Sequence, residues 1–133
     1  MTDQKPTTVT NLGVAMFTVA DQDAALSWYT EKLGWEVRTD MRFGEQGEMR
    51  WVEVAPPGST ARLALNPPMG GAPGGGGIGI ETPDVQAEYE RLKAIGDITI
   101  DSEPMTSPGA PLLFMMQDPD GNHIAVVEVP AAG

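Results

Sequence analysis

Apolar and polar residues alternate along several short segments of the chain, and two longer segments carry apolar residues at helical spacing. The first alternating segment, 12–20 (LGVAMFTVA), predicts a strand. The period changes at Asp21, and 21–34 predicts a helix with Asp21 as its N-cap and Gly34 just after its last turn. Further strands are predicted at 35–41, 49–55 and 60–66.

The same order of elements begins again after the Gly/Pro-rich segment 67–76. A strand is predicted at 77–82 and a helix at 84–96, with Asp84 as its N-cap. Three more strands are predicted at 97–103, 111–117 and 122–129.

This repeat predicts a duplicated α+β fold. The helix-capping residues Asp21 and Asp84 are separated by about 63 residues, which is the offset between the two halves. One βαβββ unit of this size cannot bury the face of its own sheet. We therefore expect a single domain, with its parts at 12–66 (first βαβββ module), 67–76 (linker) and 77–129 (second module) of residues 1–133.

Composition narrows the range of partners. The chain has 19 Asp and Glu residues against 8 Lys and Arg residues, a formal net charge of -11, which repels the phosphates of nucleic acids and attracts cationic ligands. Cysteine is absent, which excludes disulfides, zinc-thiolate sites and thiol nucleophiles. No apolar run approaches the roughly 20 residues of a membrane helix, and the polar start lacks a signal-peptide core. We expect a cytoplasmic protein without a nucleic-acid or membrane partner.

Several segments resemble the vicinal oxygen chelate superfamily, which includes glyoxalase I, extradiol dioxygenases and bleomycin-resistance proteins. These are 28–37 (WYTEKLGWEV) after 19–21 (VAD), 91–96 (RLKAIG) at the end of the second helix, and 118–128 (DPDGNHIAVVE). The resemblance covers about residues 12–129. It implies two βαβββ modules whose eight strands form one cupped mixed sheet, as in glyoxalase and bleomycin-resistance proteins, and a homodimer.

In metal-dependent members of that superfamily, His, Glu or Gln side chains at four strand positions bind the metal. The resemblance places these positions at Val14, Ala64 (or Leu65), Gly77 and Ala125, none of which can bind a cation. The single histidine, His123, then lies at the rim of the cup. Asp clusters fall at predicted caps and turns, where they serve local hydrogen bonds. The resemblance therefore implies a member without metal or cofactor, and it leaves any catalytic residue unknown.

With these positions apolar, the cup is expected to be roomy and apolar, as small-molecule sites often are. Strand alternation and the aromatic residues add further candidate ligand-binding residues, including either Met115 or Met116. An apolar strand residue also suits a core position. The candidate ligand-binding residues are Val14, Met16, Phe43, Trp51, Arg62, Ala64, Asn66, Gly77, Glu81, Phe114, Met116 and Ala125.

Three functions remain open at this point. The first is a metal-independent protein that binds and sequesters a small hydrophobic, aromatic or cationic molecule, such as an antibiotic or a metabolite. The second is a lyase, isomerase or dioxygenase-like enzyme, which needs either a metal at other positions or metal-free acid–base catalysis with Glu81 as the base, although an ion pair with Arg62 suits Glu81 better. The third is a structural or regulatory dimer with a vestigial pocket. Ala110 replaces a Trp that borders the ligand groove of resistance proteins, which argues against bleomycin itself.

Overall fold

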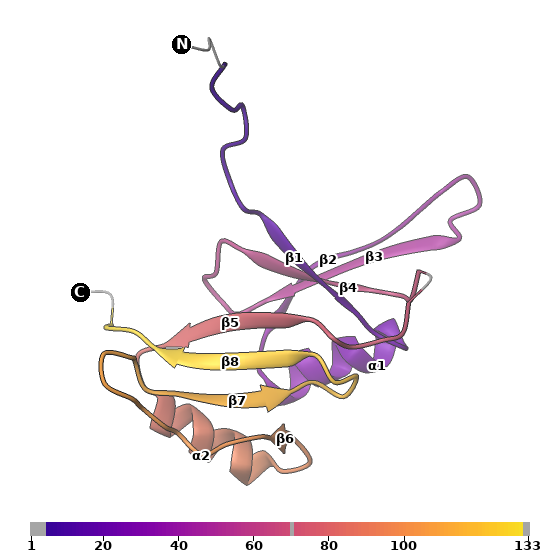
Figure 1. Cartoon of the computed structure of the whole chain (residues 1–133). Coiled ribbons are helices and arrows are strands. Elements are labelled where there is room, and N and C mark those ends of the chain that lie inside the picture. The colour runs from indigo at the N-terminus through magenta and orange to yellow at the C-terminus, as the bar shows by residue number, and fades with distance from the viewer. Residues whose placement is uncertain (1–4, 70, 132–133) are drawn as a thin grey trace.

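The computed structural model describes residues 5–69 and 71–131, and its eight strands form two four-stranded sheets (Figure 1). Sheet 1 has the strand order β1-β4-β3-β2, with bounds Val14–Thr18 (β1), Glu36–Phe43 (β2), Met49–Ala55 (β3) and Arg62–Asn66 (β4). Sheet 2 has the order β5-β8-β7-β6, with bounds Gly77–Thr82 (β5), Thr99–Ile100 (β6), Leu113–Gln117 (β7) and His123–Glu128 (β8). The predicted α+β class is confirmed.

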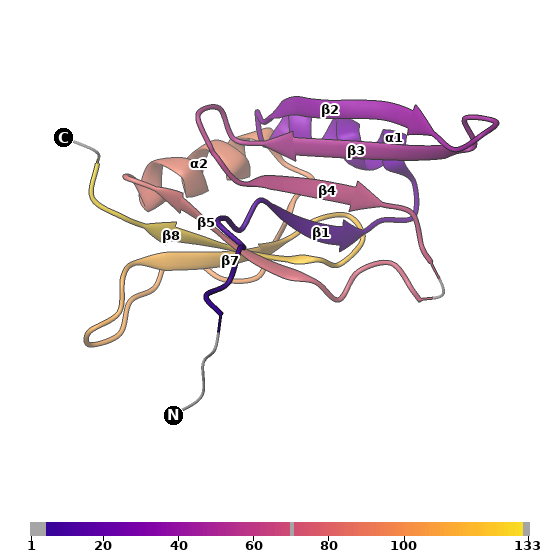
Figure 2. The ribbon, with the colours of Figure 1, turned by 90° about the horizontal axis from the view of Figure 1, so that it is seen from above.

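Both sheets have the same topology. In each half the first strand pairs in parallel with the last, β1 with β4 and β5 with β8. The remaining pairs are antiparallel. Helix α1 (Gln22–Ser27) contacts sheet 1 and helix α2 (Val85–Ile95) contacts sheet 2, as can be followed from above in Figure 2. None of the helices in residues 5–69 and 71–131 is long and apolar enough to cross a membrane.

Both helices begin where the sequence predicts. The side chain of Asp21 accepts a hydrogen bond from the backbone N–H of Ala24, and Asp84 accepts one from Ala87, each at 3.0 Å. These bonds satisfy N–H groups that have no partner within a helix. The N-cap assignments are therefore confirmed.

The second half of the first predicted helix is not a regular α-helix. After α1 the chain continues as a π-helix, η1 (Trp28–Lys32), in which the N–H of Leu33 donates to the carbonyl of Trp28, five residues earlier. The neighbouring aromatic residues Trp28 and Tyr29 are both buried there, with their rings 4.9 Å apart and nearly perpendicular. The wider turn thus accommodates two adjacent core side chains.

One hydrophobic core joins the helices to one face of each sheet. We call this covered face the inner face, and the opposite one the outer face. Alternation along β3 places Val52 and Val54 on the inner face, where both are fully buried. Core residues also come from the other strands and helices: Phe17, Leu63, Leu65, Leu92, Phe114, Met116, Ile124 and Val126.

The strand predicted at 97–103 is wrong in its extent, because β6 contains only Thr99–Ile100. Asp97 has a positive φ of 58°, so the extended backbone of the strand can begin only after this residue. Beyond it, the hydroxyl of Ser102 accepts the N–H of Met115 at 3.2 Å, in place of a backbone carbonyl. The N–H of Asp101 still donates to the carbonyl of Met115 at 2.7 Å, and regular pairing with β7 ends there.

Candidate ligand-binding face

The outer face of sheet 1 collects most of the predicted ligand-binding residues of the first half. The register aligns Met16 of β1 with Ala64 of β4, and Ala64 with Glu53 of β3. Because side chains alternate along each strand, the residues two positions away share this face. The predicted residues brought together are Val14, Met16, Phe43, Trp51, Arg62, Ala64 and Asn66.

This face is apolar and exposed. Met16 is 61% exposed, and Phe43 is 40% exposed. Met41 and Met49, which are not among the predicted residues, lie beside Trp51 and Phe43 in the β2–β3 register and are exposed as well. We call Val14, Met16, Met41, Phe43, Met49 and Trp51 the apolar outer face. Exposed apolar side chains that gather on one sheet face mark a binding or interaction site.

A carboxylate lies at the centre of the same face. Glu53 is only 6% exposed, and its two oxygens accept hydrogen bonds from the hydroxyl of Thr39 (3.1 Å) and from the indole Nε1 of Trp51 (2.9 Å). Arg62 Nε forms an ion pair with Glu53 Oε1 at 3.5 Å. Glu53 thereby fixes the orientation of the Trp51 ring. Because Glu53 lies two residues after Trp51, strand alternation could have placed it on this face from the sequence.

The predicted ion pair between Arg62 and Glu81 is wrong. Arg62 is on β4 and pairs with Glu53 of the neighbouring strand β3. Glu81 is on β5 of sheet 2 and is exposed. No ion pair within the described residues joins Glu81 to Arg62, because the nearer carboxylate lies on the adjacent strand of the same sheet.

Sheet 2 carries the predicted residues of the second half on two different faces. Gly77, Glu81 and Ala125 lie on its outer face, where Gly77 is aligned with His123. His123 is exposed at the first residue of β8, in agreement with a rim position. Phe114 and Met116 do not join this group.

Phe114 and Met116 point to the inner face and are fully buried. The Phe114 ring packs edge-on against Tyr89 of α2, with 5.4 Å between centroids. On β7 it is Met115 that is aligned with Ala125 on the outer face. Of the two methionines that the sequence leaves open, Met115 therefore occupies the expected side of the sheet.

Two pockets lie beside sheet 1, and of these the smaller is lined by residues of the apolar outer face. The smaller has a volume of about 480 Å³ and includes Phe43, Trp51, Asn66 and Met69. The larger, about 680 Å³, lies between the two halves and includes Arg62 and Glu81. Both volumes are in the range of small-molecule sites, which is roughly 300–1,000 Å³.

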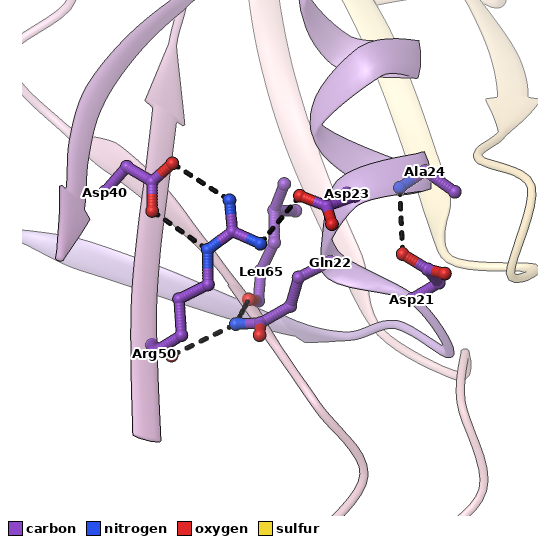
Figure 3. A network of polar contacts seen from close by, with 7 residues as sticks. All are labelled: Asp21, Gln22, Asp23, Ala24, Asp40, Arg50 and Leu65. Carbon is purple, nitrogen blue, oxygen red and sulfur yellow. Dashed lines mark hydrogen bonds and ion pairs between the residues drawn. The ribbon is translucent and has the colours of Figure 1, made fainter. Parts of the chain in front are cut away.

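Arg50 forms a wall of the smaller pocket, and its donors are already engaged (Figure 3). It donates to both carboxylate oxygens of Asp40 at 2.9 Å and to Asp23 at 2.7 Å. The hydrogen bond from Arg50 holds the pKa of Asp40 below its ordinary value. Gln22 donates to the carbonyls of Arg50 and Leu65 at 3.1 and 2.9 Å, which attaches the start of α1 to sheet 1.

The side chains present do not fit a divalent transition metal. The four positions at which the resemblance predicts metal ligands are Val14, Ala64 (or Leu65), Gly77 and Ala125, and these side chains offer no donor atom. Within residues 5–69 and 71–131, no group of three or more His, Cys, Asp or Glu side chains lies close enough to hold a metal ion. Zinc sites use about three protein ligands even where one position stays open.

This duplicated βαβββ fold with an exposed apolar sheet face belongs to a class of small α+β proteins, which similarity to known proteins identifies. The family model of the Glyoxalase/Bleomycin resistance protein/Dioxygenase superfamily matches residues 11–126. The chain belongs to this superfamily.

Relatives extend along almost the whole chain. YetH of Bacillus subtilis (strain 168) is 30% identical over 123 residues, which cover 90% of this chain and 99% of YetH. A solved superfamily member from Sphaerobacter thermophilus DSM 20745 is 32% identical, with a TM-score of 0.83 and coverage of 91% and 98%. TnmS3, an antibiotic binding protein from Streptomyces sp. CB03234, is 30% identical, with a TM-score of 0.80 and coverage of 92% and 98%.

Proposed function

We propose that this protein binds and sequesters a small hydrophobic, aromatic or cationic molecule, such as an antibiotic or a metabolite, without a metal. The observation that carries the proposal is the exposed apolar outer face, on which Phe43 is exposed and Trp51 is partly buried. The similarity to TnmS3, which is described as an antibiotic binding protein, supports the same proposal.

Binding on this face needs no chemical step. A flat ligand would displace water from exposed apolar side chains and gain stacking contacts with Trp51 and Phe43. Met16, Met41 and Met49 provide flexible, polarisable surfaces that adapt to an irregular outline. The formal net charge of -11 would favour the approach of cationic molecules.

The alternative is a lyase, isomerase or dioxygenase-like enzyme of the same superfamily. Its metal-free form needs a base such as Glu81 in an apolar cup, but Glu81 is exposed to solvent. Glu53 is buried, yet both of its oxygens already accept hydrogen bonds from Thr39 and Trp51. We therefore place the enzyme behind the binding protein, and a vestigial module last.

The proposal includes an assembly. We propose that the modules at 12–66 and 77–129, joined by 67–76, act as one domain and that two copies form a homodimer, which would cover part of the exposed outer faces. The expected cytoplasmic location stays a prediction that cell fractionation can check.

The experiment is a binding screen of protein dialysed against a chelator. Flat aromatic antibiotics and dyes are tested for an increase in melting temperature, and each hit is titrated by calorimetry. Met41→Ser should weaken a hit by about tenfold, because burial of a methionine contributes about 1.5–3 kcal/mol. Ile95→Ser, at an exposed position on α2, should leave the affinity unchanged.

Addition of Ni²⁺, Co²⁺ or Zn²⁺ to the dialysed protein should leave these affinities unchanged. Tight binding of one metal ion per chain, or ligand binding only when metal is present, would contradict the metal-independent mechanism. If no aromatic compound stabilises the protein, the binding function itself is wrong.

A further inference from the structure

Arg62 differs from most other arginines of the chain in that its hydrogen-bond donors are free. Arg50 donates to three carboxylate oxygens, and Arg91 donates to Glu88 and to two backbone carbonyls. Arg38 donates to Glu36 and to the carbonyl of Pro56. The Arg62 side chain makes an ion pair at 3.5 Å but no hydrogen bond within residues 5–69 and 71–131.

Glu53 orients Arg62 without using its outer nitrogens. The ion pair joins Glu53 Oε1 to Nε of Arg62, and among the residues that the structure describes neither Nη group of the guanidinium has a partner. The Arg62 side chain is 42% exposed, whereas the Glu53 side chain is 8% exposed. The buried carboxylate therefore acts as the fixed partner, and the guanidinium extends from it toward solvent.

The same carboxylate places Arg62 beside the stacking surface. Glu53 Oε2 accepts the indole N–H of Trp51 at 2.9 Å, while Glu53 Oε1 is paired with Arg62. One carboxyl group thus joins an aromatic ring and a guanidinium on one sheet face. A molecule stacked on Trp51 would bring a substituent of its ring within reach of Arg62.

We propose that Arg62, oriented by Glu53, donates hydrogen bonds to an acceptor oxygen, a carbonyl or a carboxylate, on a flat aromatic ligand of the apolar outer face. This inference rests on the proposed binding function and narrows its ligand class. Because the Glu53 carboxylate balances the charge of Arg62, the site suits a neutral carbonyl better than a carboxylate. A ligand that carries only a cationic amine offers no acceptor atom to the guanidinium of Arg62.

The test uses three naphthalene derivatives that differ in one substituent: 2-naphthamide, 2-naphthoate and 2-naphthylmethylammonium. Calorimetry with the wild-type protein should give the tightest binding for the amide, then the carboxylate. The ammonium compound should bind roughly tenfold or more weakly than the amide, because a hydrogen bond from a charged donor contributes about 1.5–3 kcal/mol.

Variants separate recognition from a merely structural role. Arg62→Gln should abolish the preference for the amide over the ammonium compound, whereas Lys93→Gln, which removes the same charge from α2, should retain it. Glu53→Gln leaves the charge of Arg62 without a balancing carboxylate. This variant should therefore bind 2-naphthoate more tightly than 2-naphthamide. Melting curves confirm that each variant is folded, and Arg62→Lys provides a milder change at the same position.

The outcomes distinguish this inference from the function on which it rests. Equal binding of amide and ammonium compounds by the wild type, or an unchanged order in Arg62→Gln, overturns the role of Arg62 and leaves the binding function intact. If none of the three compounds binds, the proposed function fails together with the inference.

Discussion

Asp118 is a buried carboxylate between the two halves of the chain, and four donors surround it. The hydroxyl of Tyr29, the backbone N–H groups of Asp120 and Asn122, and the side-chain amide of Asn122 all donate to it at 2.9 Å. A buried charge without such partners is strongly unfavourable. Asn122 also donates to the carbonyl of Thr18 at 3.1 Å, so this cluster attaches β1 to the turn before β8.

Tyr29→Phe should destabilise the protein by about 1–3 kcal/mol, because it removes one donor from a buried carboxylate and leaves the ring packing unchanged. Tyr29 is fully buried, so no water can replace the lost hydroxyl. Urea unfolding at neutral pH measures the difference. The matched control is Thr30→Val, which loses only hydroxyl hydrogen bonds to the carbonyls of Leu26 and Ser27 in the preceding helix α1.

The same variant should alter the alkaline limit of stability. Burial, followed by the negative charges of Asp118 and Asp120, raises the pKa of Tyr29 far above its ordinary value of 10.0. The folded state keeps this proton while the unfolded chain loses it, so stability falls as the pH rises above about 10. Tyr29→Phe should lack this part of the decline. Identical alkaline unfolding curves for both proteins would contradict the assignment.

At the scale of elements, the Arg50 cluster connects α1 to the β2–β3 hairpin (Figure 3). Arg50→Met should cost about 1 kcal/mol at neutral pH, a modest value because the Asp40 side chain is 39% exposed and water screens the pair. Arg42→Gln is a control with a smaller expected effect, since Arg42 forms no ion pair within the described residues but its charge also helps to lower the pKa of Asp40.

The contribution of the Arg50–Asp40 ion pair to stability should vanish in acid. The pKa of Asp40 is lowered from its ordinary value of 3.8 in the folded protein, so the stabilisation is present above that pH and is lost as the pH falls further. Unfolding free energies of wild type and Arg50→Met should therefore converge at low pH. A constant difference from neutral pH down to acid would show that packing of the Arg50 stem, and not its charge, is responsible.

The connection between the two sheets depends on a close approach of backbone to ring. A Cβ atom at Gly76 would lie 2.7 Å from Cδ1 of Phe17 and 3.0 Å from Oδ1 of Asn122. Gly76→Ala should lower stability by about 1–3 kcal/mol, as overpacking of a core does. Gly71→Ala, where no heavy atom lies within 4 Å of the added carbon, should be nearly neutral. Equal melting temperatures of the two variants would contradict this account.

The elements that the sequence predicted well are those with a local signal. Alternation located β3 and β5 at their observed bounds, and Asp21 and Asp84 marked the helix starts. The short β6 had no local signal, because the Ser102 hydroxyl replaces a backbone partner only after the chain has folded. Local patterns define the element, and tertiary contacts define where its pairing stops.

At the scale of the whole molecule, the candidate face was predictable in part. Alternation from Phe43 and Trp51 would have added Met41, Met49 and Glu53, because strand parity requires only the sequence. The partner of Arg62 was not predictable in this way, since it depends on which strand lies beside β4. The inward direction of Phe114 likewise follows from the register of β7 with β8.

The exposed outer faces lead to a prediction about assembly. Exposed apolar side chains cover the outer face of sheet 1, and β1 and β5 lie at the edges of their sheets, where strands invite further pairing. We expect a homodimer, since closed symmetric pairs are the commonest way to cover such a surface. Size-exclusion chromatography with light scattering over a dilution series measures the dimer dissociation constant.

Met16→Glu separates this interface from unspecific association. Met16 is 61% exposed on β1, at the edge of sheet 1, and a carboxylate there would be buried without a partner in the dimer. The dimer dissociation constant of the Met16→Glu variant should exceed that of the wild type by about tenfold or more, which corresponds to at least 1.4 kcal/mol. Ile95→Glu adds the same charge at an exposed position on α2 and should leave it unchanged. A monomeric wild type, or equal weakening by both variants, would mean that the apolar outer face stays free for the ligand alone.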